Sequence, residues 1–371
     1  MKRISTYWKW MIVLAVTIIL LHVLAISERF VNVYHHVIYI RIAEYYGGIM
    51  GKVPINVGEI MMYCAAGFLI LELVLVILLL FWRAKSKYRR WVVSYSKALL
   101  LGAAVVVLIY TLNWSIPFRY SIDLGEETVT KYTLGDLQKL RSDIVEMLNQ
   151  AAEEIGRDED GNIVYEEDVD EQVIAALKGI SDEFEYLDGS YPVMKESYCS
   201  DVLEWMNIAG YTYPYTMEVT YNKYTMSLYY PSLLAHEMSH HKGYYKEDDA
   251  NFLSEIACMK SECPYLVYSG CLDAYYYVDN AYKEALFSYL DEEEATTIWQ
   301  QRELASALVG EDLTKDRKAA QEAYNADEHA AQSFSSAAQS VSEVGWDVQS
   351  DVLEEDCYEG VVGLLLQYDW K

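Results

Sequence analysis

Three long apolar segments in the first third of the chain constrain its fold more than any other feature. They cover about residues 10–27, 60–82 and 98–114, and each has roughly the 20 mostly apolar residues that a helix needs to cross a bilayer. The first follows two basic residues, as a signal peptide would, but its length and the two later segments favour a helix that is retained. We therefore expect a membrane region of three transmembrane helices over residues 1–116.

Basic residues flank these segments on one side. The N-terminal tail has Lys2, Arg3 and Lys9, and the turn 83–90 has five cations in eight residues. The loop 28–57 has only three cations, which two acidic residues offset. Because basic flanks stay inside, we expect a multi-pass protein of the cell membrane with a cytoplasmic N-terminus and an extracytoplasmic C-terminal domain.

Charge divides the chain at nearly the same place. Residues 1–120 hold 13 Lys and Arg against 4 Asp and Glu, whereas residues 121–371 hold 16 against 52. So many carboxylates would repel a phosphate backbone, which argues against a nucleic-acid partner. The acidic part is also rich in Tyr, Leu, Val and Ala, so we expect residues 117–371 to form a folded domain rather than a disordered tail.

The patterns in this acidic part predict a mainly helical α+β domain. Apolar residues at helical spacing predict one helix over 134–155, with Thr133 as its N-cap, and another over 170–187. Residues 211–224 are rich in β-formers with near alternation, which indicates one or two strands. From Pro231 onward the chain predicts one helix after another.

Two features of the membrane region indicate particular surroundings. Residues 30–46 have the composition of an amphipathic helix that lies along the outer interface. Glu72 falls in the middle of the second apolar segment, where a carboxylate is unfavourable unless it is protonated or paired. We expect it to hold the helices together, with His22 or Asn113 as its partner.

The strongest chemical signal is a His-Glu-x-x-His motif formed by His236, Glu237 and His240. Residues four apart share one face of a helix, so both imidazoles can bind one metal ion. Glu237 could then act as general base on a water held at that ion. Gly243 follows as the expected end of this helix, and His241 points away from the pair, as a bystander or outer residue.

Catalytic zinc requires a third protein ligand and an open fourth position. A second predicted helix begins near Glu247 and should pack against the first directly after the turn. Its acidic residues Glu247, Asp248 and Glu255 are the candidates, and spacing alone does not choose among them. Acidic residues at a helix start also have a purely structural role there.

The segment 236–253 resembles the HExxH…ExxANF signature of an uncharacterised bacterial three-pass membrane family with a domain of unknown function. Residues 51–60, 264–272 and 358–366 are similar, in the same order, to further segments of that family. The resemblance therefore covers most of the chain. It implies three spans followed by a zincin-like, zinc-metallopeptidase domain.

The E-x-x-A-N element is also similar to one in soluble zincins that cleave bacterial repressors, in which the first Glu is the third metal ligand. This resemblance implies a gluzincin-like site with His236, His240 and Glu247 as zinc ligands and Asn251 as an outer helper. Asp249 replaces the usual Glu of the membrane family and Cys271 replaces a Tyr, and neither substitution affects the proposed ligands.

The leading hypothesis is a membrane-anchored zinc peptidase that hydrolyses peptide bonds outside the cytoplasmic membrane, with Zn²⁺ as cofactor, Glu237 as the catalytic base and a peptide or protein as substrate. The strand near 216–221 could align an extended substrate by edge pairing, and one hydroxyl among Tyr275, Tyr276 and Tyr277 could stabilise the oxyanion. Two alternatives remain: a cell-wall amide hydrolase, and a non-catalytic membrane assembly or sensor protein in which zinc only braces the fold.

Overall fold

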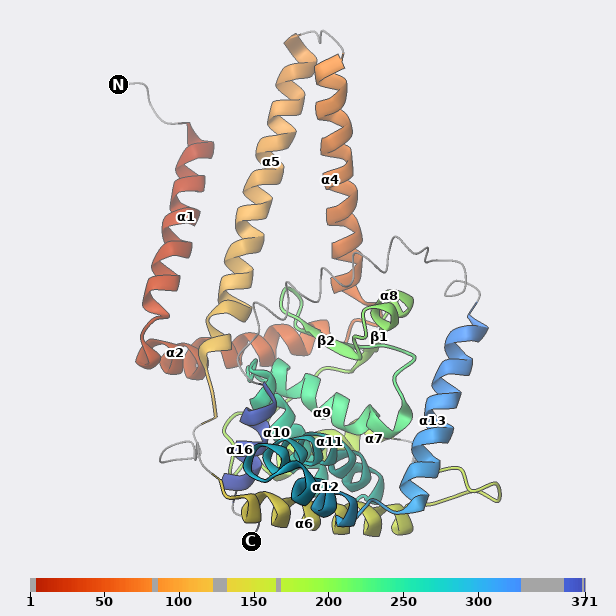
Figure 1. Cartoon of the computed structure of the whole chain (residues 1–371). Coiled ribbons are helices and arrows are strands. Elements are labelled where there is room, and N and C mark those ends of the chain that lie inside the picture. The colour runs from red at the N-terminus through yellow and green to blue at the C-terminus, as the bar shows by residue number, and fades with distance from the viewer. Residues whose placement is uncertain are drawn as a thin grey trace.

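The computed structural model describes residues 5–81, 86–122, 132–164, 168–327, 357–368 and 370 of the 371-residue chain. These residues are mostly helical and contain one small sheet. Three long helices extend from one side of a helical domain (Figure 1). The basic tail residues Lys2 and Arg3 and residues 83–85 of the basic turn lie outside the described residues.

The three helices correspond to the three apolar segments. They are α1 (Thr6–Leu24), α4 (Val57–Phe81) and α5 (Ser86–Tyr110), and each is long and apolar enough to cross a membrane by length and composition. The chain leaves α5 through a π-helical turn, η3 (Thr111–Ser115), and a 3₁₀ turn, η4 (Pro117–Arg119). The prediction of three membrane-spanning candidates is confirmed at this level.

The expected partner of Glu72 is wrong. Its carboxylate accepts a hydrogen bond from the hydroxyl of Ser96, on the facing surface of α5. Neither His22, near the end of α1, nor Asn113, in η3, can take this place, because both lie at the domain end of the helices whereas Glu72 lies halfway along α4.

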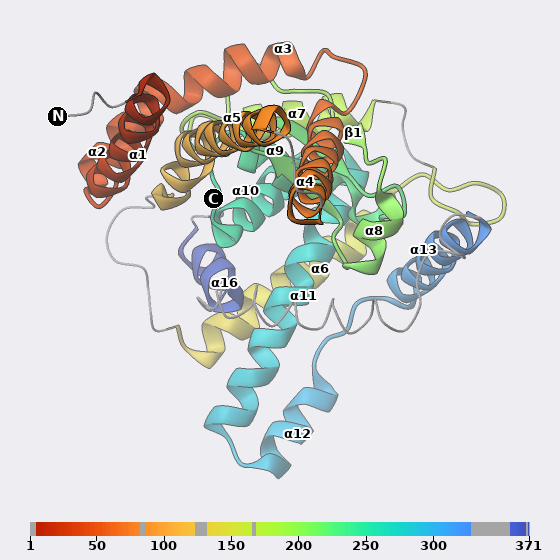
Figure 2. The same cartoon turned by 90° about the horizontal axis from the view of Figure 1, so that it is seen from above.

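A nearly continuous helical segment connects α1 to α4 and runs along one border of the domain in the view of Figure 2. It consists of α2 (Glu28–Tyr34), η1 (His35–Tyr39), η2 (Ile42–Gly47) and α3 (Gly48–Met50). Its buried residues recur every three or four positions, as in an amphipathic helix, and they include Val31, Tyr34, His35, Tyr39, Ala43 and Gly47.

The sheet has three strands in the order β1-β3-β2. β1 (Lys195–Glu196) pairs parallel with β3 (Glu218–Tyr221), and β2 (Gly210–Tyr213) pairs antiparallel with β3. The expected substrate edge at 216–221 is not an open edge, because β3 pairs with β2 over residues 218–221 and with β1 at residues 220–221. An alternating pattern identifies a strand but not its neighbours, and the two edge strands are β1 and β2.

The sheet is fastened to the start of α4 by a buried carboxylate. Glu218 of β3 accepts hydrogen bonds from the backbone N–H groups of Val57 at 3.0 Å and Gly58 at 2.6 Å. It also pairs with the ammonium of Lys195 on β1. A negative charge at a helix N-terminus satisfies free N–H groups and the positive end of the helix dipole.

The remaining described helices pack around one apolar core. α11 packs against α6 at an angle, and α10 contacts both α9 and α11 (Figure 2). These helices are α6 (Leu134–Glu154), α7 (Val169–Gly179), α8 (Ser200–Trp205), η5 (Ser227–Tyr229), α9 (Tyr230–His241), α10 (Glu247–Met259), α11 (Pro264–Tyr289), α12 (Glu292–Gln301), α13 (Ala307–Ala326) and α16 (Cys357–Gln367).

Two predicted helices have different outcomes. The helix expected over 134–155 matches α6, and Thr133 caps it in a capping box with Asp136. The helix expected over 170–187 ends at Gly179. The residues beyond it still bury apolar side chains at helix-like spacing, but Tyr186 has a φ of 69°, which a continuing helix does not allow.

Candidate metal centre

The helix α9 presents both motif imidazoles on one side. Pro231 lies in its first turn, where its missing N–H needs no partner. Leu234, Ala235 and Met238 are fully buried and face the core. Since residues four apart share a face, His236 and His240 come together, with ring centroids 4.5 Å apart.

A tight turn returns the chain to this pair. Lys242 ends α9 and Gly243 follows with a φ of +100°, a left-handed conformation that only glycine adopts without strain. Helix α10 begins four residues later at Glu247. The carboxylate of this first residue is thereby brought back over the two imidazoles.

The three side chains have the spacing of metal ligands. Glu247 Oε2 lies 3.3 Å from Nε2 of His236, and Glu247 Oε1 lies 3.6 Å from Nε2 of His240. Two ligands of a tetrahedral ion with bonds of about 2.0–2.1 Å are separated by roughly 3.3–3.4 Å. All three ligand atoms lie within 4.8 Å of one another, so the residues present fit a zinc ion.

Electrostatics couple these groups strongly. Burial lowers the pKa of His236, but the adjacent Glu247 carboxylate outweighs it and raises this pKa to about 9. Burial alone would raise the pKa of Glu247, yet the two imidazoles hold it well below its usual range. The carboxylate thus attracts positive charge to the site, and a metal cation competes with protons for the same atoms.

Outer contacts fix the orientation of His240. Its Nδ1 lies 2.8 Å from the backbone carbonyl of Tyr244, which directs Nε2 toward Glu247. The ring of Tyr245 stacks on the imidazole with centroids 5.8 Å apart and an interplanar angle of 13°. The Tyr245 hydroxyl lies 3.0 Å from that of Tyr39, in the helical segment between α1 and α4.

Asp273 is an outer residue that the sequence analysis missed. It lies on α11, and burial raises the pKa of its carboxyl to about 6 despite the nearby His236 and a hydrogen bond with Ser232. Its negative charge in turn favours protonation of His236. No local motif marks this residue, because α11 reaches the site only through tertiary packing.

Glu237 is held beside the ligands by the edge strand. The Thr212 hydroxyl lies 3.0 Å from Glu237 Oε2 and 2.8 Å from the Glu237 backbone carbonyl. A Cβ at Gly210 would lie 3.1 Å from Glu237 Oε1, so the start of β2 packs on this carboxylate. Burial raises the pKa of Glu237, which suits a group that accepts and returns a proton.

The other acidic candidates do not join the cluster. Asp248 points toward α16, where a Cβ at Gly360 would lie 2.0 Å from its Oδ2. Glu255 is completely buried two turns further along α10, and neither of its carboxylate oxygens has a hydrogen-bond partner within the described part of the chain. Burial keeps the pKa of Glu255 well above its usual range, which favours the neutral acid.

The remaining sequence candidates fall in different places. Asn251 lies one turn beyond Glu247 and donates to the hydroxyl of Tyr277 at 3.2 Å. Among the three tyrosines, Tyr276 is exposed and Tyr275 packs against a guanidinium. His241 is buried on the opposite side of α9 from the pair, with Nδ1 3.1 Å from the carbonyl of Met217.

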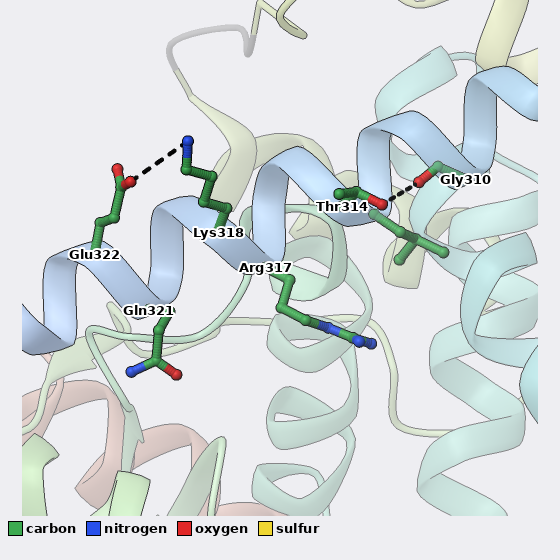
Figure 3. Close-up of a pocket in the computed structure, with 7 residues that line it drawn as sticks. Gly310, Thr314, Arg317, Lys318, Gln321 and Glu322 are labelled. Atoms are coloured by element: carbon green, nitrogen blue, oxygen red, sulfur yellow. Dashed lines mark hydrogen bonds and ion pairs between the residues drawn. The ribbon is translucent and has the colours of Figure 1, made fainter.

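A surface hollow of about 550 Å³ lies elsewhere, along α13 (Figure 3). All of its lining residues belong to that helix, including Arg317, Lys318 and Glu322. Lys318 and Glu322 form an exposed ion pair of 3.7 Å. The hollow shares no residue with the His–Glu cluster.

Comparison with known proteins gives one family. The model of a family described as protein of unknown function (DUF3810) matches residues 34–340. No curated protein and no solved structure matches the chain. The matched range includes the segment between α1 and α4 from Tyr34 onward, two of the three apolar helices and the whole His–Glu cluster.

Proposed function

We propose that this chain, which belongs to the family described as protein of unknown function (DUF3810), is a membrane-anchored zinc peptidase with a zincin-like domain. One observation carries the proposal. Two imidazoles and one carboxylate converge at metal-ligand spacing, and a fourth group, Glu237, is held beside them against a strand edge.

The donor set supports zinc in a catalytic role. His236, His240 and Glu247 would hold the ion, and among the described residues no further His, Cys, Asp or Glu joins this cluster. Three protein ligands with an open position are typical of catalytic zinc, whereas a structural site closes its fourth position. A bound Zn²⁺ supplies Lewis-acid chemistry, because it lowers the pKa of water and polarises a carbonyl oxygen.

The residues around the ligands supply the proton transfers. As a water oxygen attacks the peptide carbonyl carbon, Glu237 accepts the proton that the water releases. When the C–N bond breaks, Glu237 returns that proton to the leaving amine. The Thr212 hydroxyl donates to Glu237 Oε2 and keeps this carboxylate turned toward the ligands throughout.

The edge of β2 would align the substrate. It is the strand next to Glu237, and its backbone is paired on the β3 side. An extended peptide would pair with the other side of β2 through main-chain hydrogen bonds alone. It would then run past Glu237. Tyr277, which accepts from Asn251 one turn after Glu247, is the best placed of the three tyrosines to donate to the oxyanion.

The charge distribution supports an extracytoplasmic site. Lys9, Lys87, Arg89 and Arg90 lie near the ends of α1 and α5 that are remote from the domain. Basic flanks remain in the cytoplasm. The domain with its metal centre then faces the opposite side of the membrane.

Purified full-length protein in detergent tests this function. Its zinc content is measured by mass spectrometry, and cleavage of a mixed peptide library is followed with and without a chelator. We expect about one zinc per chain and cleavage that the chelator abolishes and zinc restores. Zinc bound without any cleavage would favour the non-catalytic alternative, and protein that binds no zinc would refute the proposal.

A further inference from the structure

The metal centre lies directly against the ends of the apolar helices. The ring of Trp114, in η3 at the end of α5, lies 4.5 Å from the ring of Tyr245. Tyr245 in turn stacks on the ligand candidate His240. One aromatic side chain thus separates the end of the third span from an imidazole of the site.

The helical segment between α1 and α4 adds a second contact of this kind. A Cβ at Gly243 would lie 2.2 Å from Nε2 of His35 in η1, so the turn after α9 packs tightly on this segment. Its other face exposes apolar side chains, with Val37 62%, Tyr45 65% and Ile49 66% exposed. Such a helix lies in the membrane interface, and its diameter of about 10 Å then separates the turn from the lipid.

The edge strand β2 connects the site to the spans. Its first residue, Gly210, packs on Glu237, and at its other end the ring of Tyr213 packs on Gly58, in the first turn of α4. The following turn is fixed to both neighbouring membrane elements. The carbonyl of Pro214 accepts from Asn113 Nδ2 of η3 at 2.7 Å.

The helices α4 and α5 are closest together away from this turn. Hydrogen bonds join α4 to α5 between Tyr88 and Leu75, Tyr95 and Phe68, and Ser96 and Glu72, from the remote end of α4 to about its middle. Toward the domain the two helices diverge (Figure 1). The end of β2 and the turn after it contact both diverging ends, because Tyr213 of β2 packs on Gly58 and Pro214 of the turn accepts from Asn113.

From this placement we infer that the substrates are polypeptides anchored in the same membrane by an apolar helix, and that they are cleaved close to the point where they leave the bilayer. The inference rests on the proposed function and names its substrate class. A chain that emerges between α4 and α5 meets the β2 edge at Tyr213 and reaches Glu237 beside Gly210. At about 3.4 Å per residue this path takes three or four residues, which places the scissile bond within about six residues of the span.

The experiment compares anchored with free substrates. Zinc-loaded full-length protein is reconstituted in vesicles of phosphatidylcholine and phosphatidylglycerol with reporters that carry one Leu/Ala span and a randomised outward segment. We expect cut sites clustered within about six residues of the span. The same sequences as soluble peptides should show a kcat/KM at least tenfold lower. When a flexible spacer is inserted next to the span, the cut sites should move into the spacer, because its residues are then the membrane-proximal ones.

A binding measurement provides a readout besides turnover. In the inactive variant Glu237→Gln, a photoreactive residue replaces Tyr213, and a control carries it at Glu293 on α12, remote from the spans (Figure 2). The first should crosslink to the membrane-proximal residues of the reporter and the control should not.

The outcomes separate this inference from the proposed function. Soluble and anchored sequences cleaved equally well, at sites scattered along the segment, would overturn the inference and leave the peptidase standing. Crosslinks at both positions alike would overturn it too. Zinc-loaded protein that cleaves neither kind of reporter would overturn the proposed function, and the inference with it.

Discussion

Glu247 Oε2 lies 3.3 Å from Nε2 of His236, although the two residues belong to different helices joined by a five-residue turn. The same carboxylate reaches His240 with its other oxygen. One side chain at the start of α10 therefore links both imidazoles of α9. The predictions below follow from this arrangement and from the contacts that hold it.

The first prediction concerns the ligands. His236→Ala, His240→Ala and Glu247→Ala should each weaken zinc binding at least a hundredfold, since each removes one of three ligands. Competition with a zinc chelator measures the affinity. His36→Ala is the control, because this imidazole is exposed and lies outside the cluster. A variant of any proposed ligand that binds zinc as the wild type does would remove that residue from the site.

The second prediction concerns Thr212. Thr212→Val keeps the shape of the side chain but removes the hydrogen bonds of its hydroxyl to the carboxylate and the backbone carbonyl of Glu237. A hydrogen bond to a charged group contributes about 1.5–3 kcal/mol, so kcat/KM should fall about tenfold or more while zinc content stays unchanged. Thr212→Ser should recover most of the activity. Equal rates for the Val and Ser variants would mean that the hydroxyl does not position the carboxylate.

The sequence was sufficient for the features that depend on neighbours along the chain. The apolar segments gave three helices, and the four-residue spacing of the motif gave a shared helix face for His236 and His240. Among three acidic candidates, spacing left the choice open, and the φ of +100° at Gly243 is what brings Glu247 back to the pair.

Contacts between segments that are distant along the chain could not be predicted from a single sequence. Asp273 and Thr212 approach the site from α11 and β2, and neither stands in a motif. The edge strand was assigned to the wrong part of 211–224, because alternation does not state which strand pairs on both sides. Glu72 accepts a hydrogen bond from Ser96 rather than from a residue near the ends of the spans, since the register of α4 against α5 follows from packing.

The third prediction concerns Gly243. A Cβ there would lie 2.2 Å from His35 Nε2, and the φ of +100° is unfavourable for any other residue. Gly243→Ala should therefore destabilise the protein by about 2 kcal/mol or more, seen as a lower midpoint of thermal unfolding in detergent. Gly156→Ala is the control, because nothing lies within 4 Å of its Cβ position. Equal midpoints for the two variants would contradict the tight packing of this turn.

The fourth prediction concerns acid sensitivity. Burial, and then the charge of His36, lowers the pKa of His35 to about 3. The unfolded chain binds a proton below about pH 6.5 that the folded chain binds only near pH 3, so the unfolded state gains stability as the pH falls. For this group, stability should be full above about pH 6.5 and decrease by about 1.4 kcal/mol per pH unit between about pH 6.5 and pH 3.

His35→Phe isolates this contribution. The aromatic replacement keeps the stacking on Tyr120, whose ring centroid lies 3.9 Å away, and has no proton to bind. The drop in the unfolding midpoint between pH 7 and pH 5 should be smaller in this variant than in the wild type. The same drop in both proteins would show that His35 does not contribute.

The most direct measurement of the central claim compares zinc-loaded wild type with Glu237→Gln on one substrate from the peptide library. The substitution preserves the size of the side chain and removes its ability to accept the proton of the attacking water. The account predicts unchanged zinc content and unfolding midpoint, with kcat/KM reduced by about 10² to 10⁴. A variant that cleaves at the wild-type rate would contradict the assignment of Glu237 as the base of a zinc peptidase.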